Sequence, residues 1–322
     1  MARRPHLTTM IDITLQNFES ELIHASMEQP VLLDIWAPWC GPCKSLGPVL
    51  EKLEQDYAGR FALAKLNSDE QPEIAGQLSQ AFGVRSIPFC VIFVGGQPVD
   101  GFVGALPEAQ VRAFLDKHVP SEDALAAGEE AEAAEQLAAE GDADAALAKL
   151  SEALALAPGD DAIRAEYLKR LLEAGRVADA RRVYEPLAPQ ALVDGRVAAL
   201  ALWLEAAEAA PKARTPEALA AALAANKRDF DARFELAQTH VAAQRFTEAM
   251  DELLEIIMRD KAWGDERARK LYVAVLELLA KPPAKPAAAE AKGTLEVTGK
   301  TAARAGDPVV DAYRRKLSMA LF

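Results

Sequence analysis

The chain carries two cysteines separated by two residues, directly after a short apolar run. Residues 31–35 (VLLDI) have the pattern of a buried strand, and residues 36–44 (WAPWCGPCK) follow it at once. Proline suits an early helical position, so Pro42 indicates that a helix starts at the cysteines. The unpaired N–H groups of a helix N-terminus stabilise a thiolate, the reactive form of cysteine. We therefore expect Cys40 to be an activated, partly exposed nucleophile, and Cys43 to resolve the mixed disulfide that Cys40 forms.

This segment resembles the active site of thioredoxins, and residues 83–88 (GVRSIP) strengthen the resemblance. Thioredoxins have a cis proline at the position of Pro88, facing the two cysteines, and a cis bond is an uncommon feature with a specific geometric role. The resemblance implies that the Ile87 backbone pairs there with an extended segment of the substrate. It also implies a third substrate loop at residues 104–105. The substrate-binding residues expected on this basis are Trp39, Gly41, Pro42, Ile87, Pro88, Gly104 and Ala105.

Asp34 lies inside the apolar run, which argues for burial rather than for an ordinary carboxylate at a strand end. A buried carboxylate resists ionisation, so it can take or give a proton near neutral pH. The resemblance implies that Asp34 moves the proton of Cys43 and that Lys65, its partner lysine, tunes it. The expected catalytic residues are therefore Cys40, Cys43, Asp34 and Lys65.

A CxxC motif can also be half of a zinc site, but a four-ligand site needs a second pair of ligands. Of the remaining candidates, Cys90 is isolated and the histidines His6, His24, His118 and His240 show no ligand spacing. We expect no metal ion and no cofactor. Cys90 lies in the apolar run 89–93, which favours core packing over a redox role.

With 322 residues the chain is too long for one thioredoxin domain, and its alanine-rich sequence with 6% aromatic residues suggests that helices form the rest. The net charge of −13 argues against a nucleic-acid partner. No apolar run reaches membrane-spanning length, and no apolar stretch follows the arginines at 3 and 4, so we expect neither a membrane span nor a signal peptide. The three cysteines suit the reducing cytoplasm, which is the expected location.

We predict an α/β thioredoxin fold, a mixed central sheet flanked by helices, over residues 9–119, after an N-terminal extension at 1–8. An all-α domain of tetratricopeptide-like (TPR-like) repeats is expected over 122–280. The strands of the first domain are expected at 11–15, 31–36, 61–66, 89–94 and 101–103, with a turn at the glycine pair 95–96.

The prediction of repeats is based on an internal periodicity of the sequence. Segments that begin at Leu137 and Leu171 align at a spacing of 34 residues, the TPR period, and a third copy begins at Ala237. Stacked helical hairpins typically form a concave surface for a protein or peptide. Alanine-rich hairpins that merely mimic the period are the alternative. The aligned small residues Ala146, Ala180 and Ala249 are expected where paired helices approach closely, and residues 197–225 read as a degenerate repeat.

A proline- and alanine-rich linker is expected over 281–305, and an amphipathic helix over 306–322. One face of this helix carries an apolar stripe, and the basic pair 314–315 lies on another face. Physical reasoning leaves two destinations for the stripe, either the last repeat or a groove of a partner protein. The stripe consists of Val310, Tyr313, Leu317 and Leu321.

A thioredoxin-like domain, TPR-like helices and the terminal segment 313–317 (YRRKL) together resemble the bacterial CnoX (YbbN) chaperedoxins. The resemblance implies a redox-active holdase that protects unfolding proteins and their cysteines and passes them to the GroEL chaperonin and the DnaK system. It also implies that the terminal helix docks to the chaperonin through Val310, Tyr313, Arg314, Arg315, Leu317 and Leu321. The alternatives are a general cytoplasmic protein-disulfide reductase, recycled by thioredoxin reductase, and an interaction module with vestigial cysteines.

Overall fold

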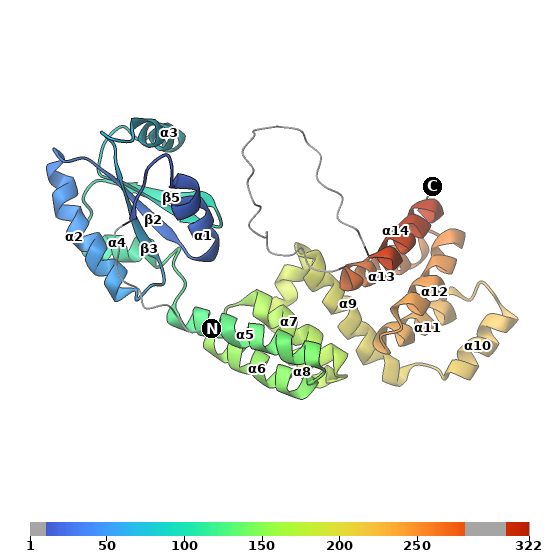
Figure 1. The fold of residues 1–322 in the computed structure, drawn as a ribbon. Coiled ribbons are helices and arrows are strands. Elements are labelled where there is room, and N and C mark those ends of the chain that lie inside the picture. Colours follow the sequence, from blue (N-terminus) through green and yellow to red (C-terminus); the bar gives the residue numbers. More distant parts are fainter. Residues whose placement is uncertain (1–10, 281–306, 322) are drawn as a thin grey trace. The chain divides into compact units, whose positions relative to one another are not determined.

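The computed structural model describes residues 11–280 and 307–321, which form two compact units (Figure 1). The first unit extends to Leu125 and the second begins at Ala126. The fold class is as predicted, a thioredoxin fold followed by an all-helical domain. The predicted extension at 1–8 and linker at 281–305 lie outside the described residues. No helix in the described part of the chain has both the length and the apolar character to cross a membrane.

The first unit contains a five-stranded mixed sheet in the order β1-β3-β2-β4-β5. β1, β3 and β2 are parallel, and β4 and β5 are antiparallel to their neighbours. β1 is shorter than predicted because the Asn17 side chain accepts a hydrogen bond from the Thr14 N–H (2.7 Å) and turns the chain. β2 and β4 have the predicted limits. The strands are β1 (Ile11–Asp12), β2 (Val31–Trp36), β3 (Ala62–Asn67), β4 (Phe89–Val94) and β5 (Gln97–Val103).

Helices cover both faces of this sheet, and the alternation along β2 decides which side chain meets which helix. Leu32 packs in one core with α2 (Gly41–Asp56) and α4 (Glu108–Leu115). Leu33 packs on the opposite face with α3 (Pro72–Phe82). A π-helical turn (η1, Phe18–His24) and α1 (Ala25–Glu28) complete the unit. Asp34 shares the orientation of Leu32, so it lies beneath α2.

The second unit is built from helical hairpins. Its helices are α5 (Glu122–Glu140), α6 (Ala143–Leu156), α7 (Asp161–Glu173), α8 (Val177–Tyr184), α9 (Gly195–Ala209), α10 (Pro216–Ala225), α11 (Phe230–Ala242), α12 (Phe246–Arg259), α13 (Trp263–Leu279) and α14 (Pro308–Leu321). Short 3-10 turns lie at Glu185–Leu192 (η2) and Ala210–Lys212 (η3). α13 includes three left-handed residues, 264–266, before its regular part.

The three aligned repeats have equivalent turns and equivalent packing positions. Gly141, Gly175 and Gln244 end the first helix of each hairpin with φ of +89°, +68° and +58°. This left-handed backbone is natural for glycine and strained for glutamine. The aligned alanines Ala146, Ala180 and Ala249 are all buried. The shared period therefore reflects real hairpins, in which a small side chain lets two helices approach.

The stretch predicted as a degenerate repeat forms α9, η3 and α10. Pro211 lies in η3, and Pro216 begins α10, where a missing N–H is harmless. α9 is central to the second unit because it packs against α7, α11 and α13. Its Trp203 is buried, with the Phe246 ring edge-on at 5.4 Å. This segment therefore joins the flanking hairpins into one core.

Candidate functional site

Cys40 and Cys43 are joined by a disulfide at the first turn of α2, with their Cα atoms 5.3 Å apart. Cys40 is the N-cap residue, and its Sγ accepts a hydrogen bond from the Cys43 N–H at 3.2 Å. Pro42 lies in the first turn, as its lack of an N–H allows. The sequence thus puts both sulfurs where helix N–H groups stabilise negative charge on Cys40 once the disulfide is reduced.

The expectation that Cys40 is partly exposed is wrong for this disulfide form. Its side chain is only 4% exposed, and Cys43 is 5% exposed. Ala37, Trp36 and Ile87 pack around the pair and cover it. The neighbouring residues form the accessible rim instead: Trp39, Gly41 and Pro42 are exposed.

The Ile87–Pro88 bond is cis, as the resemblance to thioredoxins predicts. Pro88 is buried, and Ile87 is half-buried against the disulfide. The Gly104 N–H donates to the Pro88 carbonyl (2.8 Å), which ties the third loop to the cis-proline loop. Gly104 adopts φ of +88°, a conformation that favours glycine, and Ala105 beside it is exposed. This backbone contact therefore holds together two of the loops predicted to bind a substrate segment, at Pro88 and at Gly104.

Trp39 is fixed on the rim by a residue that the sequence analysis missed. Its indole Nε1–H donates to the Asp69 carboxylate, at 3.0 and 3.2 Å from the two oxygens, although the ring is 70% exposed. An exposed aromatic ring held in this way offers a flat apolar contact beside the disulfide. Asp69 lies after β3 and carried no recognisable signal in the sequence.

Asp34 is buried within β2, as expected. The residue is 2% exposed, and burial raises the pKa of its carboxyl to about 6, because desolvation disfavours the charged form. The neighbouring Lys65 favours the charged form, but its ammonium group pairs with the Glu51 carboxylate at 2.6 Å. Glu51, which sequence reasoning missed, therefore competes for Lys65 and itself raises the pKa of Asp34.

Cys90 contacts Asp34 directly, which sequence reasoning also missed. Its Sγ lies 3.7 Å from the Asp34 Oδ1, and β2 and β4 pair these two residues across the sheet. The predicted core packing is present as well, because Cys90 is fully buried among the residues under α2 and α4. The signal that could have found the contact is the register of the two strands, which the sequence alone does not reveal.

In the structure, the apolar stripe of α14 covers α12 and α13, the first of its two possible destinations. Val310 and Tyr313 are buried, and Leu317 and Leu321 pack against the same core. The Tyr272 hydroxyl donates to the Tyr313 carbonyl at 2.8 Å. The predicted partner-binding residues therefore fall into two groups. The four apolar residues pack within the protein, and Arg314 and Arg315 are exposed.

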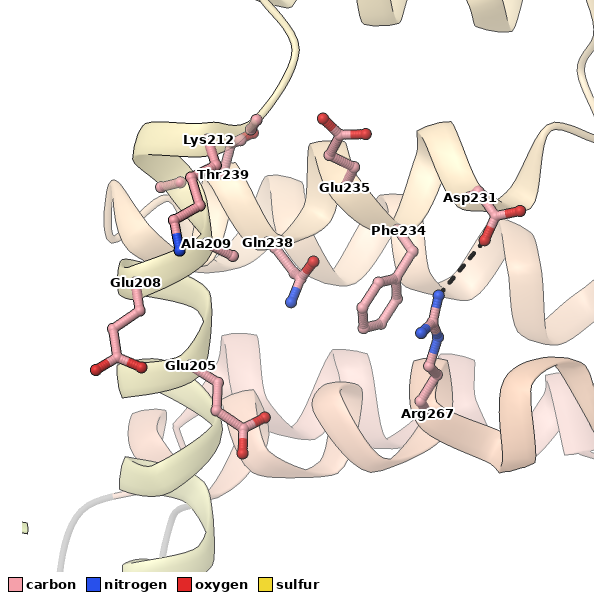
Figure 2. A pocket seen from close by; sticks show the side chains of 12 residues that line it. Glu205, Glu208, Ala209, Lys212, Asp231, Phe234, Glu235, Gln238, Thr239 and Arg267 are labelled. Atoms are coloured by element: carbon pink, nitrogen blue, oxygen red, sulfur yellow. Dashed lines mark hydrogen bonds and ion pairs between the residues drawn. The ribbon is translucent and has the colours of Figure 1, made fainter. Parts of the chain in front are cut away.

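Two of the pockets among the described residues lie in the second unit. The first, of about 570 Å³, is lined by four carboxylates, two basic residues and Phe234 (Figure 2). Arg267 lies over the Phe234 ring, 4.7 Å from its centroid, and pairs with Asp231 at 3.5 Å. The second, of about 640 Å³, lies along α9 and α13, and its lining includes five alanines, Leu202, Val273 and five charged side chains. Neither pocket presents a nucleophile beside a base, so both suit binding rather than catalysis.

Two strongly exposed apolar side chains follow directly after a residue of the second pocket. Leu192 is 90% exposed and Val193 is 88% exposed, and the preceding Ala191 lines the pocket. We call Leu192, Val193, Leu202 and Val273 the apolar patch. Exposed apolar side chains beside a pocket favour a protein-binding site. The described residues contain no group of three or more His, Cys, Asp or Glu side chains able to hold a metal ion.

Comparison with known proteins divides the chain in the same way. The thioredoxin family model matches residues 9–117, and two models of the tetratricopeptide repeat match residues 137–204 and 209–298. The thioredoxin of Chlorobaculum thiosulfatiphilum is 47% identical over 108 residues, which cover 34% of this chain and 94% of that protein. Thioredoxin 1 of Nostoc sp. and the thioredoxin of Haemophilus influenzae are 41% and 40% identical over 113 residues, 35% of this chain and 100% of each relative.

The raised pKa of Asp34 predicts a specific pH dependence of stability. A carboxyl whose pKa is higher in the folded than in the unfolded chain destabilises the fold as it ionises. The free energy of unfolding is therefore highest below pH 4, where Asp34 is protonated, and it falls as the pH rises through the folded pKa of about 6. In the oxidised protein, the stability of Asp34→Asn relative to the parent should therefore increase by about 3 kcal/mol between pH 3.5 and 7.5. Denaturant titrations at several pH values measure this. A difference that does not change with pH would contradict it.

Proposed function

The chain belongs to the thioredoxin family through residues 9–117, and we propose that it is a protein-disulfide oxidoreductase whose helical repeats hold its client proteins. The observation that carries this proposal is the disulfide at the N-terminus of α2. It lies against the residue before the cis Pro88, and the same unit contains a buried carboxyl with a raised pKa, that of Asp34. Together these features supply a nucleophile, a resolving thiol, a substrate loop and a proton acceptor.

The reaction proceeds in two exchange steps. The Cys40 thiolate attacks one sulfur of a client disulfide, the client S–S bond breaks, and the second client sulfur leaves as a thiolate. Cys43 then attacks the Cys40 sulfur, and its proton passes to the Asp34 carboxylate. The bond between Cys40 and the client breaks, and the client sulfur leaves with the electron pair. Two electrons have moved from the dithiol to the client, and the Cys40–Cys43 disulfide of the structure is the product.

The substrate surface follows from the rim of the disulfide. Among the described residues the Ile87 backbone makes no backbone hydrogen bond, so an extended client segment can pair with it. Trp39 and the 104–105 loop flank such a segment. Renewed reduction needs an external dithiol donor, a role that thioredoxin reductase fills in the cytoplasm, which is the compartment we propose.

The helical unit favours a chaperone-like role over that of a general disulfide reductase with an inert scaffold. A simple reductase needs no strongly exposed apolar side chains on its helical unit, whereas Leu192 and Val193 of the apolar patch are almost completely exposed. We infer that this patch and the second pocket hold unfolded clients on the same chain as the thiol-exchange site, as in the CnoX chaperedoxins. The second candidate function is the general reductase, and it keeps all of the redox chemistry without the holding step.

Transfer of clients to the GroEL or DnaK machines is part of the same proposal. It rests on the C-terminal segment 313–317, whose basic pair Arg314 and Arg315 is exposed while the apolar stripe covers α12 and α13. We propose that this pair makes the first contact with the chaperonin, because the stripe is buried within the protein.

The redox step predicts opposite behaviour of two cysteine variants. Cys43→Ser should accumulate mixed disulfides between Cys40 and clients, because the resolving thiol is missing. Cys40→Ser should trap none and should lose insulin reduction. Non-reducing electrophoresis of affinity-purified protein distinguishes the two. Equal trapping by both variants would show that Cys40 is not the attacking residue.

The holding step predicts that the double variant Leu192→Ser/Val193→Ser loses suppression of aggregation of a heat-unfolded protein. Its insulin reduction should stay unchanged, since the disulfide lies in the other unit. Val99→Ser, at an exposed valine of β5, is the matched control and should keep both activities. Light scattering measures aggregation. If the parent chain itself fails to suppress aggregation, the general reductase is the correct function.

Chaperonin docking predicts that Arg314→Glu/Arg315→Glu weakens co-purification with GroEL. Both residues are exposed, so the charge reversal should leave the melting temperature within a few degrees of the parent. Lys227→Glu/Arg228→Glu carries the same charge change at another exposed site and serves as the control. Equal recovery of chaperonin with both double variants would rule out the basic pair as the contact.

A further inference from the structure

Three chemically active side chains form a row across the central sheet. Strand pairing puts Lys65 of β3 and Cys90 of β4 on either side of Asp34 of β2. Leu32 lies two residues before Asp34 on β2, and Ile92 lies two residues after Cys90 on β4. Both belong to the core under α2 and α4. Asp34 and Cys90 therefore lie on the face of the sheet that α2, the helix with the disulfide, covers. The register therefore brings a third sulfur to the carboxyl that serves the redox pair.

The chemistry of this contact assigns donor and acceptor. Cys90 is fully buried, and burial, with the adjacent carboxylate, raises the pKa of its thiol well above the ordinary value. Cys90 therefore remains protonated, and its S–H can donate to the Asp34 Oδ1 at 3.7 Å. No other hydrogen bond to this carboxylate is found within residues 11–280 and 307–321, and the Lys65 ammonium pairs with Glu51.

We propose that Cys90 is a positioning residue for the resolving step, in which its thiol holds the Asp34 carboxylate and favours its ionised, proton-accepting form. This proposal rests on the proposed disulfide exchange. The groups that face Asp34 are Lys65 of β3, Glu51 of α2 and Cys90 of β4. Of these, Cys90 is the one in hydrogen-bond contact, so its loss should raise the pH at which Asp34 accepts the proton of Cys43.

The variant test follows the decay of a preformed mixed disulfide between Cys40 and a peptide, as a function of pH. In Cys90→Val the acid limb of the rate profile should move up by about one pH unit, because a donor to the carboxylate is lost. Cys90→Ser keeps a donor and should restore the position of the limb. Ile92→Val removes one methylene group from the same face of β4 and should leave the profile unchanged. Identical profiles for Cys90→Val and the parent would overturn the proposal.

A second measurement needs no variant. The chain has three cysteines, and two of them form the disulfide, so the oxidised protein contains one thiol, that of Cys90. Its S–H infrared band should shift to lower frequency as Asp34 ionises, with a midpoint near the pKa of about 6. A band that stays constant through this titration would contradict the contact.

The two proposals fail in different ways. If the parent chain reduces no disulfide, the proposed function is wrong, while the infrared titration still reports on the contact. If the parent reduces disulfides but Cys90→Val keeps the parental pH profile, only the role of Cys90 is wrong. Asp34→Asn combined with Cys90→Val should behave like Asp34→Asn alone, because both changes act through one carboxylate.

Discussion

The burial of one carboxyl group, that of Asp34, sets the charge state at the centre of the sheet in the first unit. Removing Asp34 from water raises its pKa, and this makes it a proton acceptor near neutral pH instead of a permanently charged group. Burial also requires partners, and the sheet supplies Lys65 on one side and Cys90 on the other. The arrangement weakens the fold at neutral pH, a cost typical of functional sites.

The helical unit depends on a different constraint, close approach of helices in each hairpin. Buried alanines such as Ala146 and Ala180 permit this approach, and left-handed residues at the turns reverse the chain over a short distance. Close packing of the hairpins uses small buried residues, so it does not account for large apolar side chains that are exposed to solvent. The exposure of Leu192 and Val193 is therefore the feature that most favours client binding.

Local patterns predicted much of this. The limits of β2 and β4, the start of α2 and three helical hairpins follow from residue type and spacing, and the cis Pro88 follows from the resemblance to thioredoxins. Other features depend on residues distant in the sequence. The pairing of Lys65 with Glu51 and the contact of Trp39 with Asp69 join separate elements, and no local signal marks either pair. The low exposure of Cys40 likewise depends in part on Ile87, which approaches from another loop.

The sequence by itself determined which groups could react: two cysteines at a helix start, a carboxyl within an apolar strand, and repeats with a fixed period. Only the tertiary structure decided which groups meet. Strand register put Cys90 against Asp34, and packing turned the apolar stripe of α14 onto α12 and α13. The physical reason is that local patterns fix the conformation and the buried face of each element. The pairing of elements instead depends on the complementary surfaces of segments far apart in the chain.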